Sequence, residues 1–135
     1  MKLDKRIGKN AFLSAGPGYG GSCFPKDTLA LLKTAEDYQA PLRIVESVVK
    51  VNDGRKRAMG RKIIRALGDE PRGKTVALLG LTFKPNTDDM REAPSLVLAG
   101  RLLAEGAQVS AWDPVADGSL HLDGVEIAAS ALEAL

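Results

Sequence analysis

The sequence predicts an α/β chain in which a helical segment is followed by a parallel βαβ unit. Two observations support this prediction. Apolar residues follow helical spacing from about residue 25 to residue 67. After Gly73, short apolar runs at 74–80 and 107–112 flank one further helical stretch, as parallel strands joined by a crossover helix do. We place the boundary between the two parts at residue 72, which gives segments 1–72 and 73–135.

The first segment is expected to contain two helices. Pro25 suits the first turn of a helix, where its missing N–H is not needed, and this helix should run to about Gln39. Ala40-Pro41 interrupts it. A second helix is expected from about Leu42 to Leu67, with a bend near 52–54. Cations crowd its second half, and we interpret them as a solvated face rather than a phosphate or nucleic-acid patch. They are Arg55, Lys56, Arg57, Arg61, Lys62 and Arg65.

The second segment predicts strands at 74–80 and 107–112, with a polar loop and then a helix between them. Pro94 should open that helix and Gly106 should close it. A third, short strand is expected at 125–127 and a final helix from near Ser130. Because two or three strands are too few to cover themselves, we expect 73–135 to be part of a larger Rossmann-like domain.

Composition excludes several classes of protein. The net charge is +2, too small to indicate a nucleic-acid partner, and no run of about 18 apolar residues suggests a membrane span. One cysteine and one histidine exclude an internal disulfide and the usual zinc clusters, so we predict no metal site. The basic start lacks the apolar region of a signal peptide, and we predict a cytoplasmic protein. We assign no role to His121.

The lone cysteine lies where a glycine-rich loop, 16–22, gives way to the first helix. Cys23 is expected at the helix start, where unpaired amides, the helix dipole and the ammonium of Lys26 all favour a thiolate. Asp27 lies one helical turn later, so Cys23 and Asp27 form a candidate pair for covalent catalysis. The alternative is a small buried cysteine with no chemical role. We reject the G-x-G-x-x-G match at 16–21 as a dinucleotide site, because no strand is predicted before it.

The polar loop at 81–92 follows the first predicted strand. Ligands of parallel sheets bind beyond the carboxyl ends of the strands, so this loop is the expected place for one. Its cations Lys84 and Arg91 suit an anionic ligand such as a nucleotide phosphate. A solvated, salt-bridged loop is the alternative.

Several motifs together resemble the UDP-glucose/GDP-mannose dehydrogenase family, on its UDP-glucose 6-dehydrogenase side. They are Asp4-Lys5-Arg6-Ile7-Gly8, Phe12-Leu13, the stretch from Gly16 to Asp27, and Gly80-Leu81-Thr82-Phe83-Lys84-Pro85-Asn86-Thr87-Asp88-Asp89-Met90-Arg91-Glu92. The similarity covers nearly the whole chain. It implies the latter half of a central dimerisation domain followed by a partial Rossmann-like UDP-binding domain.

The resemblance also implies an activity and site residues. Such an enzyme oxidises the C6 alcohol of UDP-glucose to the carboxylate with two NAD⁺. Cys23 would form the thiohemiacetal and thioester, and Asp27 would help manage the hydrolytic water. Lys26 and Arg91 correspond to cofactor contacts. The substrate-binding positions are Arg6, Phe12, Leu13, Ser14, Ala15, Gly16, Gly20 and Lys84, with Arg6 reaching the site of the neighbouring subunit.

The sequence also departs from the family. By the resemblance, these 135 residues are expected to lack the family's N-terminal NAD-binding domain, and one extra residue near Lys9-Asn10-Ala11 leaves the register of Arg6 open. We therefore expect a fragment that is inactive alone, with exposed apolar helix faces that drive formation of a homodimer or a higher assembly. The alternative is a non-catalytic nucleotide-binding or assembly module whose cysteine is incidental.

Overall fold

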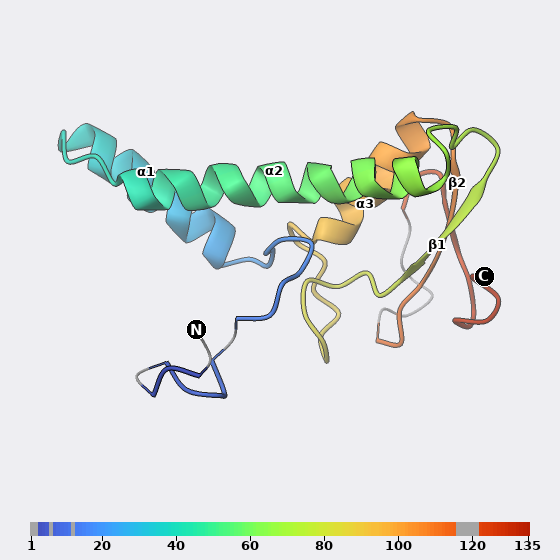
Figure 1. The fold of residues 1–135 in the computed structure, drawn as a ribbon, viewed down its shortest axis with the longest axis horizontal. Helices are drawn as coiled ribbons and strands as arrows, with labels where there is room; N and C mark the ends of the chain where they lie inside the picture. The colour runs from blue at the N-terminus through green and yellow to red at the C-terminus, as the bar shows by residue number, and fades with distance from the viewer. Residues whose placement is uncertain (1–2, 6, 12, 116–121) are drawn as a thin grey trace.

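The computed structural model describes residues 3–5, 7–11, 13–115 and 122–135 (Figure 1). Two helices, α1 (Phe24–Asp37) and α2 (Arg43–Ala66), come first. They are followed by β1 (Thr75–Leu79), α3 (Pro94–Ala104), β2 (Gln108–Trp112) and β3 (Val125–Ile127). The predicted order of helices and strands is therefore confirmed up to β3.

The three strands form one parallel sheet in the order β1-β2-β3. Thr75 pairs with Gln108 and Leu79 with Trp112, so the carboxyl ends of β1 and β2 lie level with each other. The connection from β1 to β2 passes through α3, which makes the predicted βαβ unit. Pro94 stands in the first turn of α3, and Gly106, with φ of +84°, follows its end.

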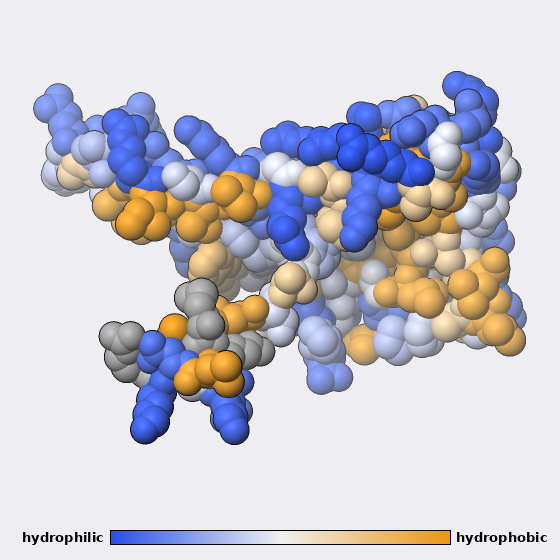
Figure 2. All heavy atoms as spheres, viewed as in Figure 1, coloured by the Kyte–Doolittle hydropathy of each residue, from blue (hydrophilic) through white to orange (hydrophobic). Residues whose placement is uncertain are grey.

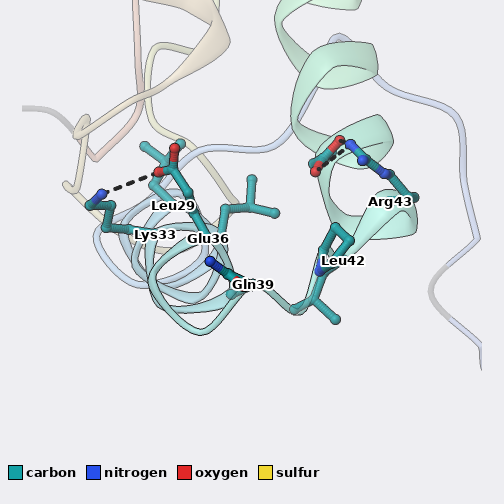
Figure 3. Close-up of a pocket in the computed structure, with 10 residues that line it drawn as sticks. Leu29, Lys33, Glu36, Gln39, Leu42 and Arg43 are labelled. Carbon is teal, nitrogen blue, oxygen red and sulfur yellow. Dashed lines mark hydrogen bonds and ion pairs between the residues drawn. The ribbon is translucent and has the colours of Figure 1, made fainter.

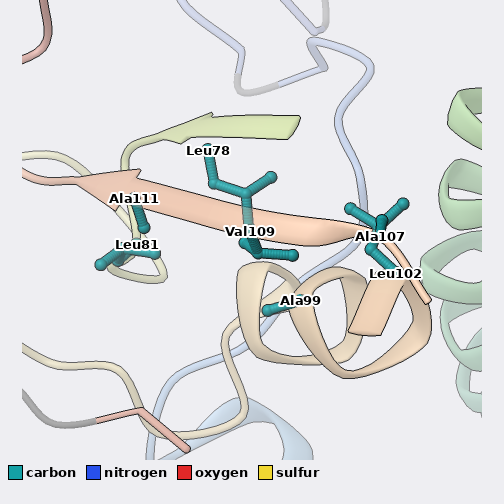
Figure 4. Packing of buried hydrophobic residues seen from close by; sticks show 7 residues of the cluster. All are labelled: Leu78, Leu81, Ala99, Leu102, Ala107, Val109 and Ala111. Atoms are coloured by element: carbon teal, nitrogen blue, oxygen red, sulfur yellow. The ribbon is translucent and has the colours of Figure 1, made fainter. Parts of the chain in front are cut away.

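The core lies between α3 and the sheet (Figure 4). Leu81 and Leu102 are its largest fully buried side chains. Ile63 and Ile64 of α2 pack against the same cluster, so the long helix is anchored to the βαβ unit. Gly60 permits this approach, because a Cβ there would lie 3.1 Å from Cγ of Arg101 on α3. The buried residues of the cluster are Leu78, Leu81, Ala99, Leu102, Ala107, Val109 and Ala111.

Two predictions about helices are wrong. No bend occurs at 52–54: α2 continues through this segment without a break, and Figure 1 shows it as a straight helix. Asn52 is buried against another part of the chain, and that tertiary contact outweighs the local weakness of Gly54. The helix expected near Ser130 is a single turn, held by Ser130 and Glu133. One turn is too short to stabilise a helix by itself.

The other end of the molecule is poorly covered. Within α1 only Ala35 is buried, and large apolar side chains of α1 and of the first half of α2 are exposed. Figure 2 shows apolar surface, in orange, along the lower side of this end. The exposed apolar side chains of the two helices include Phe24, Leu29, Leu31, Ile44, Val48 and Val51. None of the helices in the described ranges has the length and apolarity needed to cross a bilayer.

Candidate active site

Cys23 is the N-cap residue of α1, as the sequence predicts, and its side chain is exposed. Pro25 occupies the first turn of the helix, and the carbonyl of Cys23 accepts the first helical hydrogen bond, from the amide of Asp27 at 2.8 Å. The Sγ atom lies 3.6 Å from Oγ of Ser22. The thiol is therefore open to a ligand at the positive end of a helix dipole.

Lys26 and Asp27 lie on the first turn of α1. The ammonium of Lys26 is 2.5 Å from Oδ1 of Asp27, and both side chains are exposed. The hydrogen bond and charge of Asp27 raise the pKa of Lys26, with a smaller contribution from Cys23. Asp27, the candidate catalytic partner of Cys23, is thus held in an ion pair with Lys26.

Three glycines of the cysteine loop, Gly18, Gly20 and Gly21, face other parts of the protein, whereas Gly16 faces open space. A Cβ on Gly18 would lie 2.9 Å from Oδ1 of Asn52 on α2, and one on Gly20 would lie 2.3 Å from the carbonyl oxygen of Glu92. A Cβ on Gly21, whose φ is +87°, would lie 2.8 Å from the ring of Phe83. Small residues are required because the loop is packed between α2 and the 83–93 loop.

Two polar residues of α2, Asn52 and Arg55, hydrogen-bond to this loop, and a third, Lys56, lies beside Gly18. The sequence analysis did not single them out for that role. Asn52 exchanges hydrogen bonds with the backbone of Tyr19, Arg55 donates to the carbonyl of Gly16 at 2.6 Å, and Lys56 is buried. The interpretation of the cation run as a solvated face is therefore wrong for Lys56. The remaining cations of the run are exposed. They are Arg55, Arg57, Arg61, Lys62 and Arg65.

The loop after β1 is braced at both ends. Oδ2 of Asp113, the residue that follows β2, accepts from the amides of Leu81 at 2.7 Å and Thr82 at 3.2 Å. Further on, the amide of Phe83 donates to the carbonyl of Asp89 at 3.0 Å. A hollow of about 420 Å³ opens beside this loop, at the carboxyl ends of β1 and β2, where a ligand of a parallel sheet is expected.

Lys84 lines that hollow with an exposed side chain, 5.1 Å from the centre of the Phe83 ring. Arg91 is exposed and paired with Asp89 through two hydrogen bonds of 2.9 and 2.7 Å. The guanidinium of Arg91 lowers the pKa of Asp89 to about 2. In turn the hydrogen bond and charge of Asp89 raise the pKa of Arg91, with a smaller contribution from Cys23.

The segment before the cysteine loop borders a second hollow, of about 820 Å³, between residues 14–19 and α2. Ser14, Ala15 and Gly16 line it, and Leu13 is exposed just before them. Phe83 borders both this hollow and the one at the strand ends. The predicted site residues Arg6 and Phe12, and His121, lie outside the described residues.

A third hollow, of about 580 Å³, lies between the ends of α1 and α2 (Figure 3). Leu29 and Leu42 face it, and the ion pairs Lys33–Glu36 and Arg43–Glu46 stand at its rim. It contains none of the predicted site residues. Across the described ranges, no group of three or more His, Cys, Asp or Glu side chains is arranged to hold a metal ion.

Fold and site together define an α/β chain with a Rossmann-like parallel unit and an exposed cysteine beside a cationic loop. Comparison with family models gives two matches in one family. Residues 1–54 match the central domain, and residues 77–135 match the UDP binding domain, of the UDP-glucose/GDP-mannose dehydrogenase family. The chain belongs to this family.

Individual relatives agree with this assignment. A UDP-glucose 6-dehydrogenase of Rhizobium meliloti is 56% identical over 98% of the chain, and one of Bacillus subtilis is 54% identical over 86%. The structure of a UDP-glucose dehydrogenase from the archaeon Pyrobaculum islandicum superposes with a TM-score of 0.87 at 41% identity, over 96% of the chain. The chain spans 28%, 26% and 30% of the length of these three proteins.

Proposed function

We propose that this chain is part of a nucleotide-sugar dehydrogenase that oxidises UDP-glucose to UDP-glucuronate, with Cys23 as the nucleophile. The single observation that supports this proposal best is the placement of the thiol. Cys23 is exposed at the N-terminus of α1, Lys26 lies in the first turn of the same helix, and the amide of Gly21 in the cysteine loop donates to the carbonyl of Arg91 at 2.7 Å. Such surroundings favour the thiolate that covalent catalysis requires.

In the proposed mechanism, the Cys23 sulfur attacks the carbonyl carbon of the aldehyde-level sugar and forms a thiohemiacetal. Loss of hydride from that carbon to the nicotinamide that the family implies, together with loss of the proton of its hydroxyl group, would leave a thioester. Attack by water then breaks the carbon–sulfur bond, which gives the carboxylate and returns the thiol. Asp27, one turn from Cys23 and paired with Lys26, is proposed to orient that water.

The family implies a nicotinamide cofactor, which when bound would accept hydride from the sugar carbon. Lys26 and Arg91 are proposed to hold it. The residues fit this role, because both are exposed cations and each already binds a carboxylate. An exposed ammonium or guanidinium that pairs with a carboxylate also suits a phosphate.

The sugar nucleotide is proposed to bind across the cysteine loop. Lys84, at the hollow beyond β1 and β2, would bind the diphosphate. The backbone around Ser14, Ala15, Gly16 and Gly20 would wrap around the sugar nucleotide. Leu13 and Phe12 belong to the same wrapping segment, and Arg6 is proposed to serve the neighbouring subunit of a homodimer. We further propose a cytoplasmic location, with no nucleic-acid or membrane partner.

The reactivity of the thiol tests the proposed role of Cys23. Iodoacetamide should alkylate Cys23 in the folded chain at pH 6.5 several times faster than in the same chain unfolded in urea, because the helix terminus and the cations favour the thiolate. Rates measured by mass spectrometry decide the matter. An equal or slower rate in the folded chain would favour the alternative, a nucleotide-binding or assembly module with an incidental cysteine.

Titration with UDP tests the proposed binding site independently. UDP should bind the chain, and Lys84→Ala should weaken binding by about tenfold, since a charge-assisted hydrogen bond to a phosphate is lost. Arg57→Ala, an exposed cation on α2, serves as the control. Equal affinities of the two variants for UDP would contradict the assignment of Lys84.

The chain alone should form no NADH from UDP-glucose and NAD⁺.

A further inference from the structure

α2 carries two buried polar side chains that the proposed mechanism does not use. Asn52 and Lys56 lie one helical turn apart on the same face of the helix, and they are 8% and 6% exposed. Buried polar groups are costly unless they are hydrogen-bonded, and a buried ammonium more so. Their partners therefore show what this face of α2 is built to hold.

Asn52 holds the cysteine loop. Its Oδ1 accepts from the amide of Tyr19 at 2.7 Å, and its Nδ2 donates to the carbonyl of Tyr19 at 3.2 Å. The side chain thus satisfies both backbone groups of one residue, four positions before Cys23. Gly18 packs directly on Asn52 and Lys56, with its would-be Cβ at 2.9 Å from Oδ1 of Asn52.

Lys56 holds the other loop. Its ammonium donates to the carbonyl of Glu92 at 3.0 Å, and Oε2 of the same residue is 4.0 Å away. Glu92 has φ of +55°, a left-handed conformation that is uncommon without glycine. The two loops also contact each other, because the amide of Gly21 donates to the carbonyl of Arg91 at 2.7 Å. Cys23 and Arg91 are thereby tied to the same stretch of α2.

We propose that Asn52 and Lys56 are positioning residues that lock the cysteine loop to the 83–93 loop, and so set where the Cys23 thiol stands relative to Arg91. The catalytic meaning of this lock rests on the proposed function, in which Cys23 is the nucleophile. The lock itself is a property of the chain that can be measured without any turnover.

The ratio of two alkylation rates reports this placement. Iodoacetate and iodoacetamide attach to the same sulfur with loss of iodide, so access to the thiol and its ionisation affect both rates alike. Only iodoacetate carries a charge, so the ratio of its rate to that of iodoacetamide rises with the positive potential at the thiol. The ratio measured in the urea-unfolded chain gives the value without that potential.

The folded chain should show a ratio above the unfolded value. Asn52→Ala changes no charge, yet it should lower the ratio about two- to threefold, because Arg91 moves away from the thiol and a screened charge interaction is lost. Asp53→Ala, at the next and exposed position of α2, should not lower it. Circular dichroism at the same temperature shows that each variant is folded.

A charge-matched pair of variants keeps the test decisive if Asn52→Ala fails to fold. Lys56→Met should lower the ratio more than Arg57→Met, although both remove one positive charge from the same turn of α2. Equal ratios for Asn52→Ala and Asp53→Ala, or for the two methionine variants, would overturn the inference. The dehydrogenase proposal depends instead on the absolute alkylation rate and on UDP binding, so either proposal can fail while the other stands.

Discussion

At the scale of single residues, the site consists of one thiol and two cations whose positions are set by the backbone. Cys23 stands at a helix start, Lys26 follows within the first turn, and Arg91 arrives from a loop almost seventy positions later. Each cation has its own carboxylate, Asp27 for Lys26 and Asp89 for Arg91. The cations are therefore oriented before any ligand binds, which lowers the cost of ordering them.

The pair of Asp89 and Arg91 predicts a pH dependence. Because the pKa of Asp89 is lowered from 3.8 to about 2, the pair stabilises the folded chain above about pH 4, and its contribution is lost as the pH falls through 2. NMR titration of the Asp89 carboxyl carbon should give a midpoint near 2. In Arg91→Met the midpoint should rise toward 3.8, whereas Arg57→Met should not move it. A midpoint near 3.8 in the unaltered chain would contradict the pairing.

The tight packing around Gly20 predicts that adding a single methyl group there destabilises the fold. A Cβ at this position would lie 2.3 Å from the carbonyl oxygen of Glu92. Because this oxygen belongs to the backbone, it cannot move aside as the end of a flexible side chain can. Gly20→Ala should lower the free energy of unfolding by about 1–3 kcal/mol, as overpacking does. Urea denaturation measures it. Gly16→Ala, with no heavy atom within 4 Å, is the matched control and should change stability by less than about 1 kcal/mol.

At the scale of elements, α2 connects the parts of the molecule. Its second half packs Ile63 and Ile64 against the core of the βαβ unit, and its middle holds the cysteine loop through Asn52. Its first half leaves Ile44, Val48 and Val51 exposed. A single straight helix thereby carries the thiol loop at a fixed distance from the sheet, and a bend at 52–54 would break that relation.

The contact of α3 with the sheet predicts where stability is concentrated. Leu102 is fully buried between α3 and the strands (Figure 4), so Leu102→Ala should cost about 2–5 kcal/mol through lost contacts and an unfilled cavity. Val97→Ala on the same helix is the control. Val97 is 38% exposed, and its substitution should cost less than about 1 kcal/mol. Similar losses for the two variants in urea denaturation would show that this core does not stabilise the fold.

At the scale of the whole molecule, burial is uneven. The βαβ unit has a closed core, whereas α1 and the first half of α2 bury only Ala35 and Asn52 and expose a run of apolar side chains (Figure 2). Contiguous exposed apolar surface of this kind is covered in stable proteins by another domain or another subunit. The uneven burial supports the predicted self-association of the chain.

Light scattering over a range of concentrations should therefore show a dimer or a higher assembly. Ile44→Glu, which places a charge where a side chain 82% exposed now presents apolar surface, should shift the population toward monomer. Lys50→Gln, which makes the same change of one charge unit at an exposed polar position of the same helix, is the control. A monomer at every concentration in the unaltered chain would contradict the prediction.

The sequence alone determined the local structure, because its signals are local. Pro25 and Pro94 mark helix starts, Gly106 marks a helix end, and the apolar runs before Gly80 and Asp113 mark parallel strands. The position of Cys23 at a helix N-terminus follows from the same local rules. So does the expectation of a ligand at the strand ends, where the hollow lined by Lys84 lies.

Only the tertiary structure decided which residues of distant segments contact each other. The cation run of α2 gave no sign that Lys56 turns inward while Arg57 faces solvent, because that depends on which face of the helix meets the 83–93 loop. The same holds for Asn52, which hydrogen-bonds to the backbone of Tyr19 within the segment of α2 where Gly54 predicts a bend. Contacts between residues 33 to 36 positions apart leave no local pattern, and they join α2 to the cysteine loop and to the 83–93 loop.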